Sequence, residues 1–97
     1  MSETNKKGRS QYLYLERIVR GFANHRRIEV LELLKKQPEM SVSDIAEKLG
    51  INFKTASAHA QRLAIAGLIM KRSDSVSIRH RLTSRGEFIL KFLRTLE

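Results

Sequence analysis

The side chains in this sequence that could do chemistry are mainly basic. Lys and Arg number 19 against 10 Asp and Glu, which gives a formal net charge of +9. Within residues 51–85 there are seven Lys and Arg and a single acid, Asp74, so this third of the chain carries +6. Cations gathered in this way bind polyanions by neutralising their phosphates and releasing counterions. The charge therefore predicts a nucleic acid or an anionic membrane surface as the first partner to consider.

Other chemistries lack the residues that they need. The sequence has no cysteine, which excludes disulfides, thiolate metal sites and cysteine nucleophiles. Its three histidines, His25, His59 and His80, are scattered and make no recognisable metal site. Paired carboxylates, a nucleophile with a nearby base and a glycine-rich phosphate loop are also absent. The sequence thus predicts no enzyme, no cofactor and no metal site.

The length and composition predict one folded domain. A chain of 97 residues with 41% hydrophobic residues can form one small core. Residues 1–10 are polar and aperiodic, so we predict a disordered basic tail there and a folded domain over residues 11–97. No apolar run is long enough to span a bilayer, and the first residues do not resemble a signal peptide. We therefore expect a soluble, cytoplasmic protein without a membrane partner.

Hydrophobic spacing predicts four helices before residue 67 and one after residue 83. The first runs from residue 11 to about residue 23, with one apolar face formed by Leu15, Ile18, Val19 and Phe22. The next three follow the capping residues Asn24, Ser41 and Asn52 and end before Pro38, Gly50 and Gly67. The last follows Thr83, with Ile89, Phe92, Leu93 and Leu96 on one face.

Two strands, over residues 68–72 and 76–82, are predicted between the last two helices. In the second strand Val76, Ile78, His80 and Leu82 alternate with polar residues, so we expect these four to face the interior, with His80 packed beneath the hairpin. A short helix, a turn with glycine and a second helix form a helix-turn-helix. Followed by a hairpin, this order predicts a mainly helical winged helix-turn-helix domain.

Three segments resemble the ArsR-type winged-helix repressors. Residues 23–31 (ANHRRIEVL) resemble the family pattern ADxxRxxIL, and residues 41–50 (SVSDIAEKLG) resemble (S/T)VxELAxxLG. Residues 55–69 (TASAHAQRLAIAGLI) are similar to TVSxHLxxLxxAGLV, and residues 81–83 to the end of the wing. The resemblance covers residues 18–83. It implies a dimeric DNA-binding transcription regulator.

The sequence departs from the metal-sensing members of that family. They carry Cys-x-Cys near the start of the third helix, where this chain has residues 40–43 (MSVS), and the last helix here lacks His and Asp. Metal sensing is therefore not expected. Residues 83–86 (TSRG) before an apolar helix also resemble MarR-type proteins, which share the winged-helix plan.

The helix after Asn52 is the predicted recognition helix. A helical wheel places Ala56, Ala60 and Leu63 on one side and Lys54, Ser57, Ala58 and Gln61 on the other. Gln and Ser can bond base edges, Ala can touch a thymine methyl, and Lys can reach a phosphate. With the cations of the hairpin, the predicted contacts to double-stranded DNA are Lys54, Thr55, Ser57, Ala58, His59, Gln61, Arg62, Lys71, Arg72, Arg79 and Arg81.

Two residues of this helix have alternative interpretations. His59 could donate to a phosphate or be a partly buried structural histidine between the helix and the hairpin. Phe53, in the first turn, is expected to pack in the core against the preceding helix, with a base contact as the alternative.

The first and last helices are expected to form a homodimer. They carry more apolar residues than one small core uses, and the predicted interface comprises Tyr12, Leu15, Ile18, Phe88, Ile89, Phe92, Leu93 and Leu96. The alternative is that both helices complete the core of a monomer. The function expected overall is a repressor that binds operator DNA as a homodimer. A winged helix that binds protein or RNA within a larger complex is the alternative function.

Overall fold

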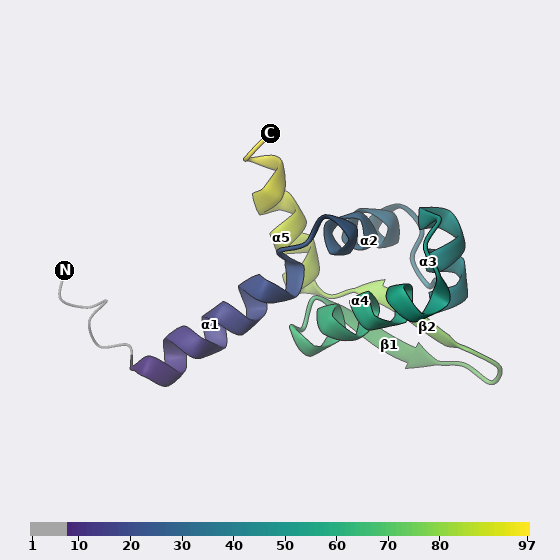
Figure 1. Ribbon diagram of the computed structural model, residues 1–97, viewed down its shortest axis with the longest axis horizontal. Coiled ribbons are helices and arrows are strands. Elements are labelled where there is room, and N and C mark those ends of the chain that lie inside the picture. The colour runs from purple at the N-terminus through teal and green to yellow at the C-terminus, as the bar shows by residue number, and fades with distance from the viewer. Residues whose placement is uncertain (1–7) are drawn as a thin grey trace.

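The computed structural model describes residues 8–97 and confirms the predicted winged helix-turn-helix. The elements are α1 (Arg9–Phe22), α2 (His25–Lys36), α3 (Val42–Leu49), α4 (Phe53–Ile65), β1 (Ile69–Ser73), β2 (Ile78–Leu82) and α5 (Ser84–Arg94). The helix α1 begins two residues before its predicted start, so Arg9 and Ser10 are helical. The rest of the predicted tail, residues 1–7, lies outside the described residues. Figure 1 shows α2, α3 and α4 packed together above the hairpin, and α1 projecting away from them.

Side-chain caps set the beginnings of four helices. The four predicted N-cap residues all accept hydrogen bonds from the first turn that follows them: Asn24, Ser41, Asn52 and Thr83. At α3 the cap is reciprocal, because the Asp44 carboxylate also accepts from the Ser41 N–H at 3.2 Å. Gly50 and Gly67 follow α3 and α4 with φ values of 67° and 78°, which end both helices as predicted.

The core surrounds α2, which packs against α3, α4, α5 and β2. The largest fully buried side chains of the core are Val30, Leu31, Leu34, Ile45, Leu63, Leu68 and His80. From α5 the buried side chain is Leu90, 2% exposed, while the predicted apolar face of that helix is only half-buried or exposed. The core is therefore filled without most of the apolar side chains of α1 and α5.

The hairpin is regular near the body and exposed at its tip. β1 and β2 pair antiparallel, from Ile69 opposite Leu82 to Ser73 opposite Ile78. His80 is 1% exposed, and its Nδ1 lies 3.0 Å from the Met40 carbonyl oxygen, so its predicted place beneath the hairpin is confirmed. The predicted burial of Val76 and Ile78 is wrong, since they are 86% and 50% exposed. The tip extends past the helical body, where no core can cover it (Figure 1).

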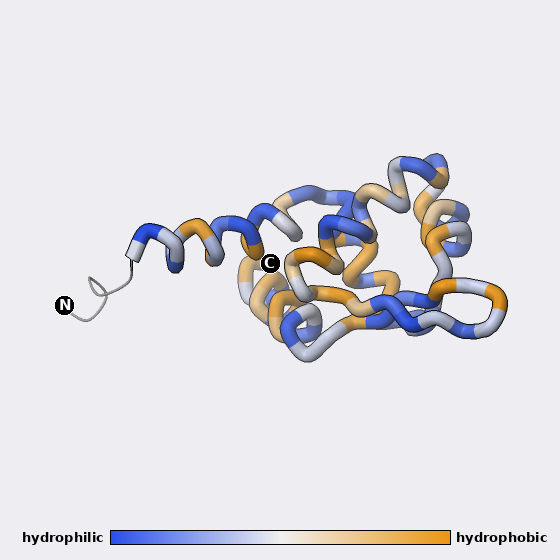
Figure 2. Tube along the Cα trace, turned by 90° about the horizontal axis from the view of Figure 1, so that it is seen from below, coloured by the Kyte–Doolittle hydropathy of each residue, from blue (hydrophilic) through white to orange (hydrophobic). Residues whose placement is uncertain are grey.

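The helix α1 packs against the body mainly near its C-terminal end. Gly21 is its one buried residue, and Leu15 and Val19 remain 39% and 52% exposed. Figure 2 shows hydrophobic segments along the projecting part of α1. Among the described residues, no helix has the length and apolar character that crossing a membrane requires.

Candidate nucleic-acid interface

The helix α4 presents a small, polar face to solvent. Ala56, Ala60 and Leu63 are at most 2% exposed, which confirms the predicted buried side of this helix. On the opposite side Lys54, Ala58 and Gln61 are exposed and Ser57 is half-buried. Together with Asn52 and Phe53, these four residues line an open hollow of about 730 Å³. Ser57 and Ala58, in the middle of this face, have small side chains that leave room for a groove of DNA to approach the helix.

Phe53 is 57% exposed, so its predicted place in the core is wrong. It is the first residue of α4, and the buried side of the helix begins only at Ala56. The ring lies at the border between the polar face and a second hollow of about 320 Å³ that reaches Ile78 of the hairpin and Val42 of α3. Phe53, Val42 and Ile78 thus place apolar side chains next to the polar face of α4.

The predicted phosphate contacts of the hairpin are held by acidic partners. Arg72 and Arg81 both approach the carboxylate of Glu39, with N–O distances of 3.0 and 3.6 Å. Arg79 donates to the Glu39 carbonyl oxygen at 3.1 Å and lies 3.6 Å from the Asp74 carboxylate. Lys71 is exposed on the same hairpin. The cations thus face solvent in fixed positions, and a contact with DNA would replace these ion pairs.

Glu39 holds this arrangement in an unusual backbone conformation. Its φ is 69°, a left-handed value that costs a residue with a side chain about 1–3 kcal/mol. Its N–H donates to the His80 carbonyl oxygen at 2.9 Å, which ties the loop to β2. Sequence reasoning missed Glu39, because the residue lies far along the chain from the arginines that it contacts.

His59 contacts α2 rather than the hairpin. The Nε of Arg27 donates to His59 Nδ1 at 3.3 Å, and Arg27 Nη1 donates to the carbonyl oxygens of Arg20 and Gly21 at 2.9 and 3.2 Å. The predicted structural position of His59 between helix and hairpin is therefore corrected to the contact between α2 and α4. Sequence reasoning did not find this role of Arg27, because the tertiary fold alone brings its partners in α1 and α4 together.

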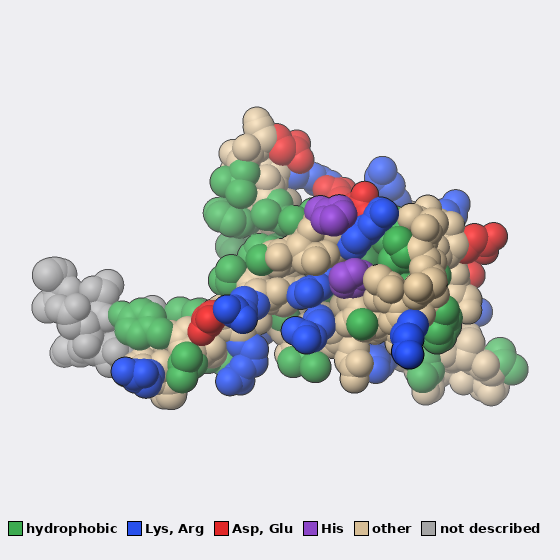
Figure 3. All heavy atoms as spheres, in the orientation of Figure 1, with side chains coloured by type: hydrophobic (Ala, Val, Ile, Leu, Met, Phe, Trp, Pro, Cys, Tyr) green, Lys and Arg blue, Asp and Glu red, His purple; other side chains and the backbone are tan. Residues whose placement is uncertain are grey.

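Positive charge accumulates around this contact. Burial lowers the pKa of His59, and the charges of Arg27, His25 and Arg26 lower it further. Burial also lowers the pKa of Arg27, with a further contribution from Arg62. Figure 3 shows Lys and Arg side chains along the face formed by α1 and α4, whereas most acidic side chains visible in this view lie over α2, α3 and the chain end.

The predicted dimer residues lie on α1 and α5 and leave a large apolar surface uncovered. Phe88, Phe92 and Leu96 are 68%, 48% and 68% exposed, and they follow one another at intervals of four residues along α5 and the turn after it. Tyr12 and Leu15 are exposed on α1, while Ile18, Ile89 and Leu93 are half-buried. The two helices are linked where Arg85 Nη2 donates to the Tyr14 hydroxyl at 3.0 Å.

Within residues 8–97, no three His, Asp or Glu side chains are grouped as a metal site.

Comparison with known structures places the chain among winged-helix proteins. The homodimeric winged helix-turn-helix DNA-binding domain of Mb0332 from Mycobacterium bovis, a possible ArsR-family transcriptional regulator, is 29% identical, with a TM-score of 0.79 over 94% of this chain and 86% of that one. The transcriptional regulator HlyU from Vibrio vulnificus is 26% identical, with a TM-score of 0.70 over 97% of this chain and 92% of that one.

A MarR family transcription regulator is 25% identical, with a TM-score of 0.71 over 87% of this chain and 58% of that one. No curated protein matches the sequence. The model of the MarR family matches residues 23–80, which include the helix-turn-helix and most of the hairpin. The resemblance to ArsR-type proteins thus holds for the shared winged-helix plan, and the segment matched is more than half of the chain. The chain belongs to the MarR family.

Proposed function

We propose that this protein is a transcription regulator that binds double-stranded DNA as a homodimer and represses by occluding a promoter. The observation that carries the proposal is the exposed face of α4. Lys54, Ser57, Ala58 and Gln61 line one open hollow, and no acidic residue occurs between Glu47 and Asp74. A face with base-edge donors and acceptors and without carboxylates suits the major groove of DNA.

The homodimer is supported by the exposed apolar surface of α1 and α5 and by the similarity to the homodimeric Mb0332 domain. That similarity also supports an ArsR-type relationship alongside membership of the MarR family. A two-fold axis through the apolar surface would place two copies of α4 on successive turns of one duplex. With DNA as its partner, the proposed location is the cytoplasm.

The proposal is tested by titrating a labelled DNA duplex with the protein at about 50 mM and about 200 mM salt. We expect tight binding at the lower concentration and an affinity loss of about 1,000-fold or more at the higher one, if six or more phosphates are contacted. Fluorescence anisotropy measures both constants. Negligible affinity at the lower salt concentration would refute the proposal.

Recognition of a specific DNA sequence is tested with the variant Gln61→Ala. The DNA used is selected by the wild-type protein from a random pool. We expect a loss of about 1–3 kcal/mol on the selected sequence and little change on random DNA, because an amide that bonds a base edge contributes only at its cognate base. Gln37→Ala, which truncates an exposed glutamine at the end of α2, is the matched control. Equal losses for Gln61→Ala on both DNAs would contradict this role.

A further inference from the structure

A basic pocket lies where the C-terminal half of α1 crosses the C-terminal end of α4. Arg17, Arg20 and Gly21 of α1 and Arg62 and Ile65 of α4 line this hollow of about 270 Å³. Three of its five lining residues carry guanidinium groups, from two helices that are distant in sequence. Arg17 and Arg20 are not among the residues of α4 and the hairpin that are predicted to contact DNA.

The pocket exists because α1 and α4 approach very closely. A Cβ atom on Gly21 would lie 2.5 Å from the Cβ of Ala66, a distance that two carbon atoms do not tolerate. Arg27 fastens the same crossing, since its guanidinium donates to the Arg20 and Gly21 carbonyl oxygens and to His59 of α4. Arg17 and Arg20, which precede Gly21 on α1, therefore line the same hollow as Arg62.

The positive charge of the pocket is largely uncompensated. In the described part of the chain, Arg17 and Arg62 form no ion pair. Arg20 lies 3.2 Å from the Glu16 carboxylate, but its side chain is 79% exposed, so the pair is weak. The lowered pKa of the neighbouring Arg27, partly caused by Arg62, reports the same excess of positive charge.

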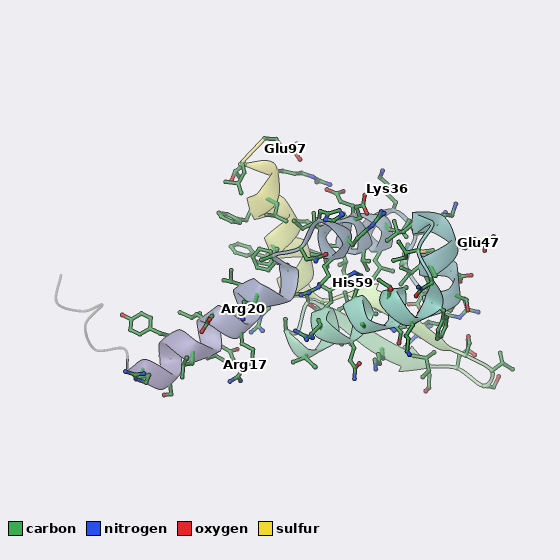
Figure 4. The ribbon with its side chains drawn as sticks, viewed as in Figure 1. Arg17, Arg20, Lys36, Glu47, His59 and Glu97 are labelled. Carbon is green, nitrogen blue, oxygen red and sulfur yellow. The ribbon has the colours of Figure 1, made fainter. Side chains whose placement is uncertain are left out.

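The pocket opens beside the face of α4 that is proposed to meet DNA. Figure 3 shows Lys and Arg side chains on α1 and α4 in a single view, and Figure 4 shows Arg17 and Arg20 on the part of α1 that is nearer to α4. Lys36 is at the opposite side of the molecule in that view. One DNA duplex can therefore lie along α4 and continue past the pocket.

We propose that Arg17 and Arg20 of α1, together with Arg62 of α4, form a phosphate-binding site for the backbone of duplex DNA, next to the segment that the polar face of α4 contacts. This inference rests on the proposed function. Because α1 also carries the proposed dimer surface, the pocket lies on the dyad side of α4, and the phosphates that it holds belong to the stretch between the two half-sites. Guanidinium groups suit phosphates because their planar donors match the oxygen atoms.

The size and lining of the pocket favour a phosphate group over an organic ligand. Sites for drug-sized molecules occupy about 300–1,000 Å³. This hollow is smaller, and three of its five lining side chains end in guanidinium groups. A phosphate needs only a few cationic donors, and three arginines line this hollow.

The test compares Arg17→Ala with Lys36→Ala, which removes the same charge on the opposite side of the molecule. We measure duplex binding by the full chain over a range of salt concentrations. For Arg17→Ala we expect binding about 3- to 10-fold weaker at about 0.1 M salt and a salt slope lower by about 0.9, which is the value of one phosphate contact. Lys36→Ala should leave the slope unchanged, and Arg17→Lys should restore most of the binding.

The outcomes separate the two proposals. If the wild-type protein binds no duplex, the proposed function fails. If the wild-type protein binds but Arg17→Ala and Lys36→Ala behave alike, the phosphate site is refuted and the proposed function stands. A titration with inorganic phosphate, followed by the amide signals of Gly21 and Arg62, tests the remaining source of the anion. Saturation by free phosphate that Arg17→Ala abolishes without changing the DNA slope would also overturn the proposal.

Discussion

At the scale of single residues, the contact between Arg27 and His59 has a protonation requirement. His59 Nδ1 accepts a hydrogen bond from Arg27, so the ring must be neutral with its proton on Nε2. Protonation would remove the acceptor and add a cation beside Arg27, His25 and Arg26 of α2 and close to Arg62 of α4. The folded protein therefore disfavours the charged ring.

This requirement predicts a loss of stability in mild acid. The pKa of His59 in the folded state is below its unfolded value of about 6.5, so the unfolded chain binds the proton more readily. The contribution is fully present above the unfolded pKa and is lost as the pH falls below it. We expect the free energy of unfolding, measured with urea at about pH 7.5 and about pH 5, to fall less in His59→Gln than in the wild type.

Glutamine keeps an oxygen that can accept from Arg27 but does not titrate in this range. His25→Gln is the control, because His25 lies in the same cationic surroundings and makes no contact of this kind. An equal fall for the wild type and His59→Gln would show that the contact does not respond to pH.

The residues that sequence reasoning found are those whose partners are close in sequence. Asn24 and Ser41 cap their helices through atoms two or three residues away, and both were predicted. The contact of Arg27 with His59 spans 32 positions, and no local pattern indicates it. Phe53 was assigned to the core by its apolar character alone, although the first turn of α4 lies outside the core.

At the scale of elements, one carboxylate joins the loop before α3 to both strands of the wing. Glu39 pairs with Arg72 of β1 and Arg81 of β2, and its backbone bonds to β2 as well. The carboxylate neutralises part of the charge of these two cations, which are predicted to contact DNA phosphates. The wing therefore approaches DNA with part of its charge already neutralised.

Glu39→Gln should strengthen the binding of non-specific DNA by several fold at low salt and steepen its salt dependence. The substitution releases Arg72 and Arg81 for phosphates, whereas the lost surface ion pairs contribute only about 0–1 kcal/mol to stability. Anisotropy titrations with random duplexes measure the effect. Glu47→Gln removes an equal charge from the exposed side of α3, so a similar gain in that variant would mean that net charge alone is responsible.

The elements were predictable where one side of each is buried. The alternation of apolar and polar residues identified the hairpin strands. It predicted the burial of Val76 and Ile78 wrongly, because the tip of the hairpin extends past the core. Sequence periodicity identifies the apolar face of a strand and does not reveal whether anything covers it. The same limit applies to α1, whose apolar face was found but whose projection from the body was not.

At the scale of the whole molecule, the exposed rings of α5 determine the expected assembly. Phe88 and Phe92 remain 68% and 48% exposed on a helix whose buried contact is made by Leu90. Exposed aromatic residues in a row of this kind mark an interaction surface. The sequence could predict this surface from composition, because the apolar residues exceed what a small core can hold.

Phe92→Glu is expected to dissociate the dimer. A charge placed in an apolar interface must be buried without a partner, which opposes association strongly. Sedimentation should show the wild-type protein as a dimer and the variant as a monomer at micromolar concentration. Val76→Glu, at the exposed tip of the wing, should remain a dimer. A wild-type monomer under these conditions would contradict the proposed assembly.

The contact of Gly21 with Ala66 links the geometry of such a dimer to the DNA that it can fit. The 14 residues of α1 form a rod of about 21 Å, and this rod meets α4 at that one close contact. A rotation of about 10° at the contact would displace the far end of the rod, about 18 Å away, by about 3 Å. A bulkier residue at position 21 would therefore alter the separation of the two recognition helices, and with it the number of base pairs between half-sites, without touching any side chain that meets DNA.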